Sequence, residues 1–314
     1  MHNFDWQDAA ARHALRRVLL IYTGGTIGMG RNAQTGALEP LDFRHLMDNL
    51  YELRSLNTEV DTYSLAHPLD SSNMNPQHWA RLARIVADRY NAYDGFVILH
   101  GTDTMAYTSS ALSFMLMNLT KPVILTGSQL PIGQPRTDAK ENLLTSIELA
   151  AACDDEGFAR VPEVCIYFNG HLLRGNRATK QNAEGFNAFE SFNYPHLCDA
   201  GVSFTFRTHH ILQPDRHLPL NVQTCMNTNV VVFSLFPGIQ ECIVRHVLAA
   251  PELRGIVTRS FGAGNAPQSP WILKLLRDAS DRGVTIVNIS QCETGCVEMG
   301  LSMHRACSCR TPAW

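Results

Sequence analysis

The chain has 314 residues, of which 45% are hydrophobic and 18% are charged, and its formal net charge is −3. This length and composition are those of a globular protein that buries a large core and has room for two domains. Because the chain lacks basic blocks and long apolar runs, neither a nucleic-acid partner nor a membrane partner is expected. The polar first residues favour a cytoplasmic location.

Nine cysteines are scattered along the chain, and most of them, such as Cys165, lie in apolar runs. Buried, reduced thiols are the expected form in a cytosolic protein of this size. Cys292 and Cys296, like Cys307 and Cys309, are close in sequence, but without matching histidines this spacing is a weak indication of zinc. The sequence therefore predicts no metal site.

The first predicted strand covers Val18–Tyr22 and leads into Gly24 and Gly25, with Thr26 directly after them. Such an apolar run is typical of a strand buried on both faces. The glycines allow a sharp turn, which would hold Thr26 at the carboxyl end of the strand, where open α/β sheets bind ligands. Three interpretations stay open: a structural turn, a phosphate-binding turn without the usual G-x-G-x-x-G spacing, and a hydroxyl nucleophile.

Strands and helices alternate in the N-terminal part, which predicts a parallel, wound α/β domain. Asn75 and Pro76 are typical of an N-cap followed by the first helical position. Further strands are expected at residues 95–99, 123–125 and 164–168, and helices at 40–53, 76–90, 105–117 and 139–151.

The regular pattern fades between Gly201 and Asn227, where an alternating segment favours a half-exposed antiparallel strand. The domain boundary is therefore placed there. Strand and helix signals resume after it, which predicts a second, smaller α/β domain. The expected organisation is an N-terminal domain at 1–212, a linker at 213–226 and a C-terminal domain at 227–314. In the C-terminal domain strands are expected at 230–236, 255–258 and 284–289, and helices at 239–248 and 270–282.

Hydroxyl groups and charges gather at four predicted strand ends, at Thr26, Ser71–Ser72, Thr102–Asp103 and Lys180. Each has an ordinary explanation, since Asp103 can cap the following helix and Lys180 lies on a polar stretch. Together they supply what cleavage of an amide requires: a hydroxyl nucleophile, a base, and a carboxylate that orients the base. Lysine suits the role of base because its pKa moves readily on burial.

Three motifs resemble those of the bacterial-type L-asparaginases, most closely the cytoplasmic type I branch. They are YTGGTIG at Tyr22–Gly28, HGTDTM at His100–Met105 and RGNRATK at Arg174–Lys180, and the resemblance runs from Val18 to about Gly300. It implies the asparaginase/glutaminase fold, with a larger N-terminal wound α/β domain and a smaller C-terminal flavodoxin-like α/β domain.

By this resemblance, Thr26 is the threonine nucleophile, and Thr102, Asp103 and Lys180 form a second catalytic group that activates a hydroxyl or water. The implied reaction converts L-asparagine to L-aspartate and ammonia, either through a β-aspartyl ester or directly. The resemblance implies no metal and no organic cofactor.

The resemblance also implies how the substrate is held. Asp70 and Ser71, together with Thr102 and Asp103, would bind the α-carboxylate and α-amino groups, and charge assistance makes such contacts strong. Small residues around Ser128 would line the pocket and the oxyanion region.

Assembly and regulation follow from the same resemblance. The family forms homo-oligomers, as dimers or tetramers in which a neighbour completes each site, and Asn265 matches the residue that reaches across. Some type I enzymes bind asparagine at a second, regulatory site, and Thr179 and Arg259 lie in the stretches that build it. A hyperbolic dependence of rate on asparagine would argue against such regulation here.

The last residues depart from the family pattern. After Gly300 the chain reads LSMHRACSCRTPAW at Leu301–Trp314, without periodicity, where the family continues with further strand and helix. We hypothesise a frameshift, which would leave the C-terminal domain truncated. Two alternatives to an active L-asparaginase stay open: a non-catalytic or weakly active asparagine-binding remnant, and an asparaginase-like subunit of a tRNA-dependent amidotransferase.

Overall fold

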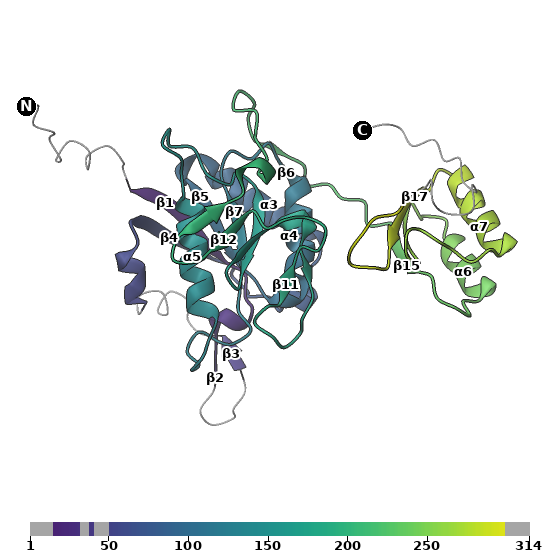
Figure 1. Ribbon diagram of the computed structural model, residues 1–314, viewed down its shortest axis with the longest axis horizontal. Helices are drawn as coiled ribbons and strands as arrows, with labels where there is room; N and C mark the ends of the chain where they lie inside the picture. The colour runs from purple at the N-terminus through teal and green to yellow at the C-terminus, as the bar shows by residue number, and fades with distance from the viewer. Residues whose placement is uncertain (1–14, 32–37, 41–49, 299–314) are drawn as a thin grey trace, which may run out of the picture. The chain divides into compact units, whose positions relative to one another are not determined.

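The computed structural model describes residues 15–31, 38–40 and 50–298 (Figure 1). The chain divides into two compact units, Met1–Cys225 and Met226–Trp314, each with hydrophobic cores of its own. Most of the helix predicted at 40–53 lies outside the described residues, as does the tail Leu301–Trp314.

A mixed sheet of eight strands forms the centre of the first unit. Its strands are β1 (Arg16–Tyr22), β4 (Thr58–Ser64), β5 (Gly95–Leu99), β7 (Val123–Thr126), β8 (Val164–Phe168), β9 (His171–Arg174), β12 (Cys198–Ala200) and β13 (Phe204–Phe206). Their spatial order is β13-β12-β9-β8-β7-β5-β1-β4. Neighbours among β4, β1, β5, β7 and β8 are parallel, whereas β9, β12 and β13 extend the sheet in antiparallel fashion beyond β8.

The central strands are buried on both faces because helices cover the sheet on each side. Successive residues of β1 point into different cores: Leu20 packs with Leu143, whereas Ile21 packs in the cluster that contains Leu112. Burial of such apolar side chains is the main stabilising contribution to the unit. The helices are α3 (Pro76–Arg89), α4 (Met105–Met115) and α5 (Ala139–Ala151).

The buried elements agree with the sequence-based expectations. The strands predicted at 95–99 and 164–168 coincide with β5 and β8, and the helix predicted at 139–151 coincides with α5. The N-cap prediction for α3 is also confirmed, because the side-chain oxygen of Asn75 accepts the first backbone N–H groups of the helix.

Strands β4, β9 and β12 have no counterpart among the predicted strands. The sequence of β4, TEVDTYS, is half exposed and only weakly apolar, and its order comes from parallel pairing with β1. Strands β9 and β12 are short and pair with each other across many intervening residues. Local periodicity carries little information on such partner-dependent strands.

Several shorter elements connect these layers. Two-stranded pairs are formed by β2 (Met29–Arg31) with β3 (Leu38–Pro40), β6 (Leu116–Met117) with β14 (Asn221–Val222), and β10 (Thr179–Lys180) with β11 (Phe189–Glu190). Because β14 pairs with β6, part of the segment predicted as a linker is attached to the first unit. Single turns of 3₁₀-helix are η1 (Thr26–Gly28), η2 (Tyr51–Ser55), η3 (Ser71–Asn73), η4 (Tyr90–Ala92), η5 (Thr102–Thr104), η6 (Gly175–Arg177) and η7 (Thr208–His210).

The second unit contains a parallel sheet of three strands, in the order β15-β16-β17, whose core is closed by two helices. Its elements are β15 (Val230–Ser234), α6 (Glu241–Leu248), β16 (Gly255–Ser260), α7 (Pro270–Asp281) and β17 (Thr285–Ser290). Each strand and helix predicted for this part of the chain has a counterpart here, with bounds that differ by a few residues.

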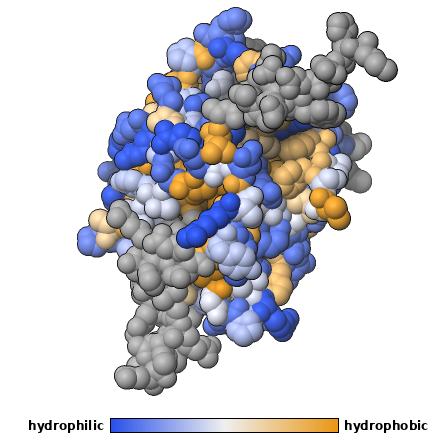
Figure 2. Space-filling model, turned by 90° about the vertical axis from the view of Figure 1, so that its left-hand side faces the viewer, coloured by the Kyte–Doolittle hydropathy of each residue, from blue (hydrophilic) through white to orange (hydrophobic). Residues whose placement is uncertain are grey.

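Apolar and polar groups are mixed on the surface. On the face in Figure 2, small hydrophobic areas lie between hydrophilic side chains. None of the helices in the described part of the chain combines the length and the apolar character needed to cross a membrane.

Candidate active site

Two turns, one after β1 and one after β5, touch each other through their backbones. The Thr23 N–H donates to the Leu99 carbonyl at 3.0 Å, and a Cβ on Gly25 would lie 2.6 Å from the nitrogen of Gly101. Gly25 also has φ +89°, a conformation that side chains of L-residues rarely adopt. Glycine is therefore required at Gly25, and this close approach brings the segments that begin η1 and η5 together.

A third turn, η3, packs against the other two. A Cβ on Gly24 would collide with the Leu69 carbonyl, and one on Gly101 would lie 2.5 Å from Ser71 Oγ. Thr104 fixes the same arrangement, since its hydroxyl donates to the Ser71 carbonyl at 2.6 Å. The three turns predicted to carry hydroxyl groups thus meet at one edge of the sheet, at the carboxyl ends of parallel strands.

Lys180 joins Thr102 and Asp103. Its ammonium group donates to Thr102 Oγ1 at 2.9 Å and to Asp103 Oδ1 at 2.7 Å. The Lys180 side chain is only 19% exposed, whereas that of Asp103 is 65% exposed. Lys180 reaches this position from β10, not from the end of a strand of the large sheet. The carboxylate orients the amine, and the amine holds the Thr102 hydroxyl.

Thr26 begins η1 and is half-buried. The carbonyl of the next residue, Ile27, accepts a hydrogen bond from the Ile132 N–H at 3.4 Å, so the loop after β7 lies beside the Thr26 turn. Through Gly25 and Gly101, the Thr26 turn is also in contact with the turn of Thr102. The arrangement presents two threonines from separate strands on neighbouring turns.

Asp70 and Ser71 occupy different environments on the third turn. Asp70 is exposed, and its carboxylate accepts a 2.9 Å hydrogen bond from the Ser72 N–H as the cap of η3. Hydrogen bonds from Ser72 also lower the pKa of Asp70, so the group is ionised at neutral pH. Ser71 is buried beside Gly101, with its oxygen directed at the Thr102 turn.

Ser128 and its neighbour Gln129 lie on the loop after β7. Ser128 is buried, and its hydroxyl donates to the Leu130 carbonyl at 2.6 Å, so this hydroxyl is engaged within its own loop. Gln129, which was not among the predicted site residues, accepts the Thr102 hydroxyl proton at 3.4 Å. Its amide nitrogen donates to the carbonyls of Ala183 and Gly185. The signal that could have found it is its place just after a predicted strand.

His100 supports the Thr102 turn from inside the core. It is fully buried, and its Nδ1 lies 2.7 Å from the Gly101 carbonyl, which can only accept, so Nδ1 carries the proton. Nε2 then accepts from the Thr108 hydroxyl at 2.9 Å, and Thr108 Oγ1 accepts from Trp79 Nε1 at 3.0 Å. Burial lowers the pKa of His100 to about 4, so the ring is neutral at physiological pH.

The remaining predicted residues are Thr179, Arg259 and Asn265, and none of the contacts described above involves them. Thr179 is exposed on β10, opposite Glu190 of β11. Arg259 and Asn265 belong to the second unit, and both are exposed there. Asn265 closes a small loop, with backbone hydrogen bonds to Phe261 in both directions.

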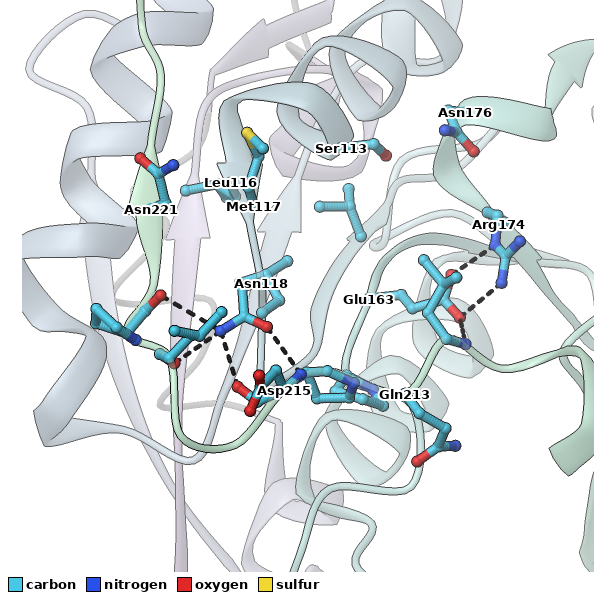
Figure 3. A pocket seen from close by; sticks show the side chains of 17 residues that line it. Ser113, Leu116, Met117, Asn118, Glu163, Arg174, Asn176, Gln213, Asp215 and Asn221 are labelled. Carbon is cyan, nitrogen blue, oxygen red and sulfur yellow. Dashed lines mark hydrogen bonds and ion pairs between the residues drawn. The ribbon is translucent and has the colours of Figure 1, made fainter. Parts of the chain in front are cut away.

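A cavity of about 700 Å³ in the first unit holds none of the predicted site residues (Figure 3). Several of its polar groups are paired: Arg174 donates to Glu163 at 2.6 and 2.9 Å, and Asn118 binds backbone groups of Asp215 and Leu218. These contacts hold the segment 212–221 against the unit.

Comparison with known proteins agrees with this architecture. The family described as Asparaginase, N-terminal matches residues 17–212, and the Glutaminase/Asparaginase C-terminal domain matches residues 229–309. L-asparaginase 1 of Escherichia coli K12 is 42% identical over 291 residues, which cover 91% of this chain and 82% of that protein. The crystal structure of L-asparaginase I from Vibrio cholerae superposes with a TM-score of 0.83 at 38% identity, covering 92% of this chain and 85% of the other.

A more distant relative is a component of the glutamyl-tRNA(Gln) amidotransferase of Pyrococcus abyssi. It is 30% identical over 302 residues, which cover 91% of this chain and 65% of that protein. The family matches and the structural neighbour together confirm the expected asparaginase/glutaminase fold. The chain belongs to the asparaginase family.

Proposed function

We propose that this protein is an L-asparaginase, which hydrolyses the side-chain amide of L-asparagine to L-aspartate and ammonia. The observation that carries the proposal is that Lys180 contacts both Thr102 and Asp103. The turn that holds Thr102 and Asp103 also touches the turn of Thr26. The similarity to proteins named L-asparaginase, over most of the chain, supports the same reaction.

In the proposed mechanism, the Thr26 hydroxyl attacks the amide carbon and ammonia leaves with a proton. A water molecule then cleaves the resulting β-aspartyl ester, which releases aspartate and restores the hydroxyl. Thr102, Lys180 and Asp103 serve proton transfer. While Lys180 is an ammonium group it donates to Thr102, and Thr102 donates to Gln129. Activation therefore requires Lys180 to lose a proton, so that it can accept one from the Thr102 hydroxyl.

The charged groups of asparagine fit the polar groups around these turns. The carboxylates of Asp70 and Asp103 suit the α-amino group, and the hydroxyl of Ser71 suits the α-carboxylate. Ser128 serves the pocket through its small size, since its hydroxyl already donates to Leu130. The reaction we propose needs no metal and no organic cofactor.

Assembly and location belong to the same proposal. We expect a homo-oligomer, a dimer or tetramer, in which Asn265 of one subunit completes the site of another. Regulation by a second asparagine at Thr179 and Arg259 is part of this hypothesis. The cysteines in the described ranges form no disulfides, which fits the reducing cytoplasm.

Ammonia release from free L-asparagine by the purified full chain tests the proposal. We expect turnover in the wild type, strong loss in Thr26→Ala and Thr102→Ala, and no change in Thr208→Ala, which removes an exposed threonine hydroxyl from η7. Equal rates in all four proteins would contradict the assignment of the site.

The same assay separates the alternatives. Asparagine binding without ammonia release would favour a catalytically weak remnant. Ammonia release that depends on a charged tRNA and a partner protein would favour an amidotransferase component, as in the relative from Pyrococcus abyssi.

A further inference from the structure

Three side chains that commonly bind metals meet at the antiparallel edge of the large sheet. They are His171, His196 and Asp199, and one ligand atom of each lies within 4.8 Å of the others. Nδ1 of His171 and Nδ1 of His196 lie 2.9 Å and 3.1 Å from the same atom, Asp199 Oδ1. The two imidazole rings stand side by side, with centroids 4.3 Å apart. Two nitrogens and one carboxylate oxygen therefore form one compact cluster.

The strand register builds this cluster. His171 on β9 and Asp199 on β12 are direct cross-strand partners, so their side chains share one face of the sheet. His196 comes three residues before Asp199, and its carbonyl accepts a 3.0 Å hydrogen bond from Arg207. Arg207 also pairs with the second oxygen of Asp199, at 2.5 Å. Backbone pairing thus places His171 beside Asp199, and the contact with Arg207 holds His196 in the loop before β12.

Both ring nitrogens of His196 face carboxylate oxygens. Its Nδ1 faces Asp199 Oδ1, and its Nε2 faces Glu190 Oε1 at 2.9 Å. Both neighbours are carboxylate oxygens, which only accept, and a neutral imidazole has a single N–H. His171 brings a second nitrogen to the same oxygen of Asp199. A cation placed between the two nitrogens and that oxygen would leave His196 Nε2–H free to donate to Glu190.

We propose that His171, His196 and Asp199 bind a divalent cation of the zinc type. Two imidazole nitrogens and one carboxylate oxygen are a ligand set of intermediate softness, suited to Zn²⁺, Co²⁺ and Ni²⁺. Bonds of about 2.0–2.1 Å place tetrahedral ligands roughly 3.3 Å apart. The two nitrogen-to-oxygen separations of 2.9 and 3.1 Å therefore need to widen by a few tenths of an ångström, and all three ligand atoms lie within 4.8 Å of one another. Solvent completes the coordination, since all three side chains are partly exposed.

The surroundings favour a cation. Arg207 pairs with Oδ2 of Asp199, which leaves Oδ1 directed at the two histidines. With neutral histidines, the charges of Asp199, Glu190 and Arg207 sum to −1, which attracts a cation. Glu190 orients His196 as carboxylates orient metal-binding histidines in known sites.

A bound ion would stiffen the region that carries Lys180. It would tie β9 to β12 and fix His196, which in turn holds Glu190 of β11. Strand β11 pairs with β10, where Lys180 lies opposite Phe189. The ion is thus a structural clamp that takes no part in the hydrolysis, so the inference stands independently of the proposed function.

Equilibrium dialysis of the metal-free full chain against Zn²⁺ at neutral pH tests the inference. We expect His171→Ala and His196→Ala to bind one ion fewer than the wild type. The matched control His217→Ala removes another exposed histidine of the same unit and should bind as the wild type does. Because exposed thiols also bind Zn²⁺, Cys292→Ser/Cys296→Ser is included and should keep the ion.

Co²⁺ identifies the ligands by spectroscopy. We expect visible d–d bands that disappear in both histidine variants, without thiolate-to-metal charge transfer from this ion. Glu190→Ala removes only the partner of a ligand, and should weaken Zn²⁺ binding about 10- to 100-fold without abolishing it. Circular dichroism of each variant checks that it is folded. The inference is overturned if the histidine variants bind as many ions as the wild type, or if the wild type binds none below millimolar Zn²⁺.

Discussion

Replacing Lys180 with methionine separates catalysis from stability at the proposed site. The change keeps the length of a side chain that is only 19% exposed but removes the amine that contacts Thr102 Oγ1 and Asp103 Oδ1. Asp103 is 65% exposed, and an exposed ion pair contributes only about 0–1 kcal/mol to the free energy of unfolding. We therefore expect little change in thermal stability.

The effect on turnover should be far larger. A positioned acid or base contributes about 100- to 10,000-fold to rate, so kcat for asparagine should fall by that factor. Ammonia release at saturating asparagine measures kcat, and a thermal unfolding curve on the same sample measures stability. Lys140→Met is the control, because Lys140 also forms an exposed ion pair, at 2.9 Å to Glu52 on the first unit. Turnover in Lys180→Met within threefold of Lys140→Met would refute the catalytic role.

Three further changes probe the structure around the site. Gly25 has φ +89°, and Gly25→Ala places a Cβ 2.6 Å from the nitrogen of Gly101. We therefore expect several kcal/mol of destabilisation in denaturant unfolding and loss of activity. The control Gly133→Ala, in open space, should be tolerated. The pKa of His100 is lowered to about 4 in the folded protein from its ordinary 6.5, so between these pH values only the unfolded chain binds the extra proton. The free energy of unfolding should therefore fall by roughly 3 kcal/mol as the pH drops from 6.5 to 4. His100→Gln should remove this part of the pH dependence of unfolding. Arg174→Met leaves the buried carboxylate of Glu163 without its cation and should cost about 3–5 kcal/mol in the same unfolding assay, with much of the loss recovered when Glu163→Gln is added.

The buried strands could be predicted from the sequence because a strand that is buried on both faces is a continuous apolar run. The apolar runs Gly95–Leu99 and Val164–Phe168 coincide with β5 and β8. The first leads into the turn of Thr102, and the second leads into β9. Strand β4 was missed because its sequence alternates only weakly and its partner is β1, far away in sequence. Pairing of this kind depends on the folded sheet and not on the segment itself.

Part of the candidate site could be predicted from the sequence for a similar reason. Thr26 and Thr102 directly follow strong strand signals, and parallel strands end at one edge of a sheet. Lys180 was a candidate only as a charge on a polar stretch, since β10 has two residues and no pattern of its own. The resemblance is what grouped it with Thr102 and Asp103. The contact of Gln129 with Thr102 and the hydrogen bonds of His100 could be identified only in the structure. The local sequence does not indicate which hydroxyl or carbonyl group a side chain will bind.

The cluster of His171, His196 and Asp199 lay beyond sequence reasoning altogether. Its members do not follow a metal-binding spacing, and only the register of β9 with β12 brings the first and last together. Sequence spacings that indicate a metal site apply to ligands on one turn or hairpin. This set instead depends on a pair of residues on neighbouring strands.

The most direct measurement is a double-mutant cycle on kcat/KM for L-asparagine, with Thr26→Ala, Thr102→Ala and both together. Groups that serve one substrate in one reaction show strongly non-additive losses, whereas independent positions add in free energy. Because Gly25 touches Gly101, we expect the double variant to be little worse than the poorer single variant. Fully additive losses, or a single variant that keeps wild-type activity, would contradict a shared site at these two turns.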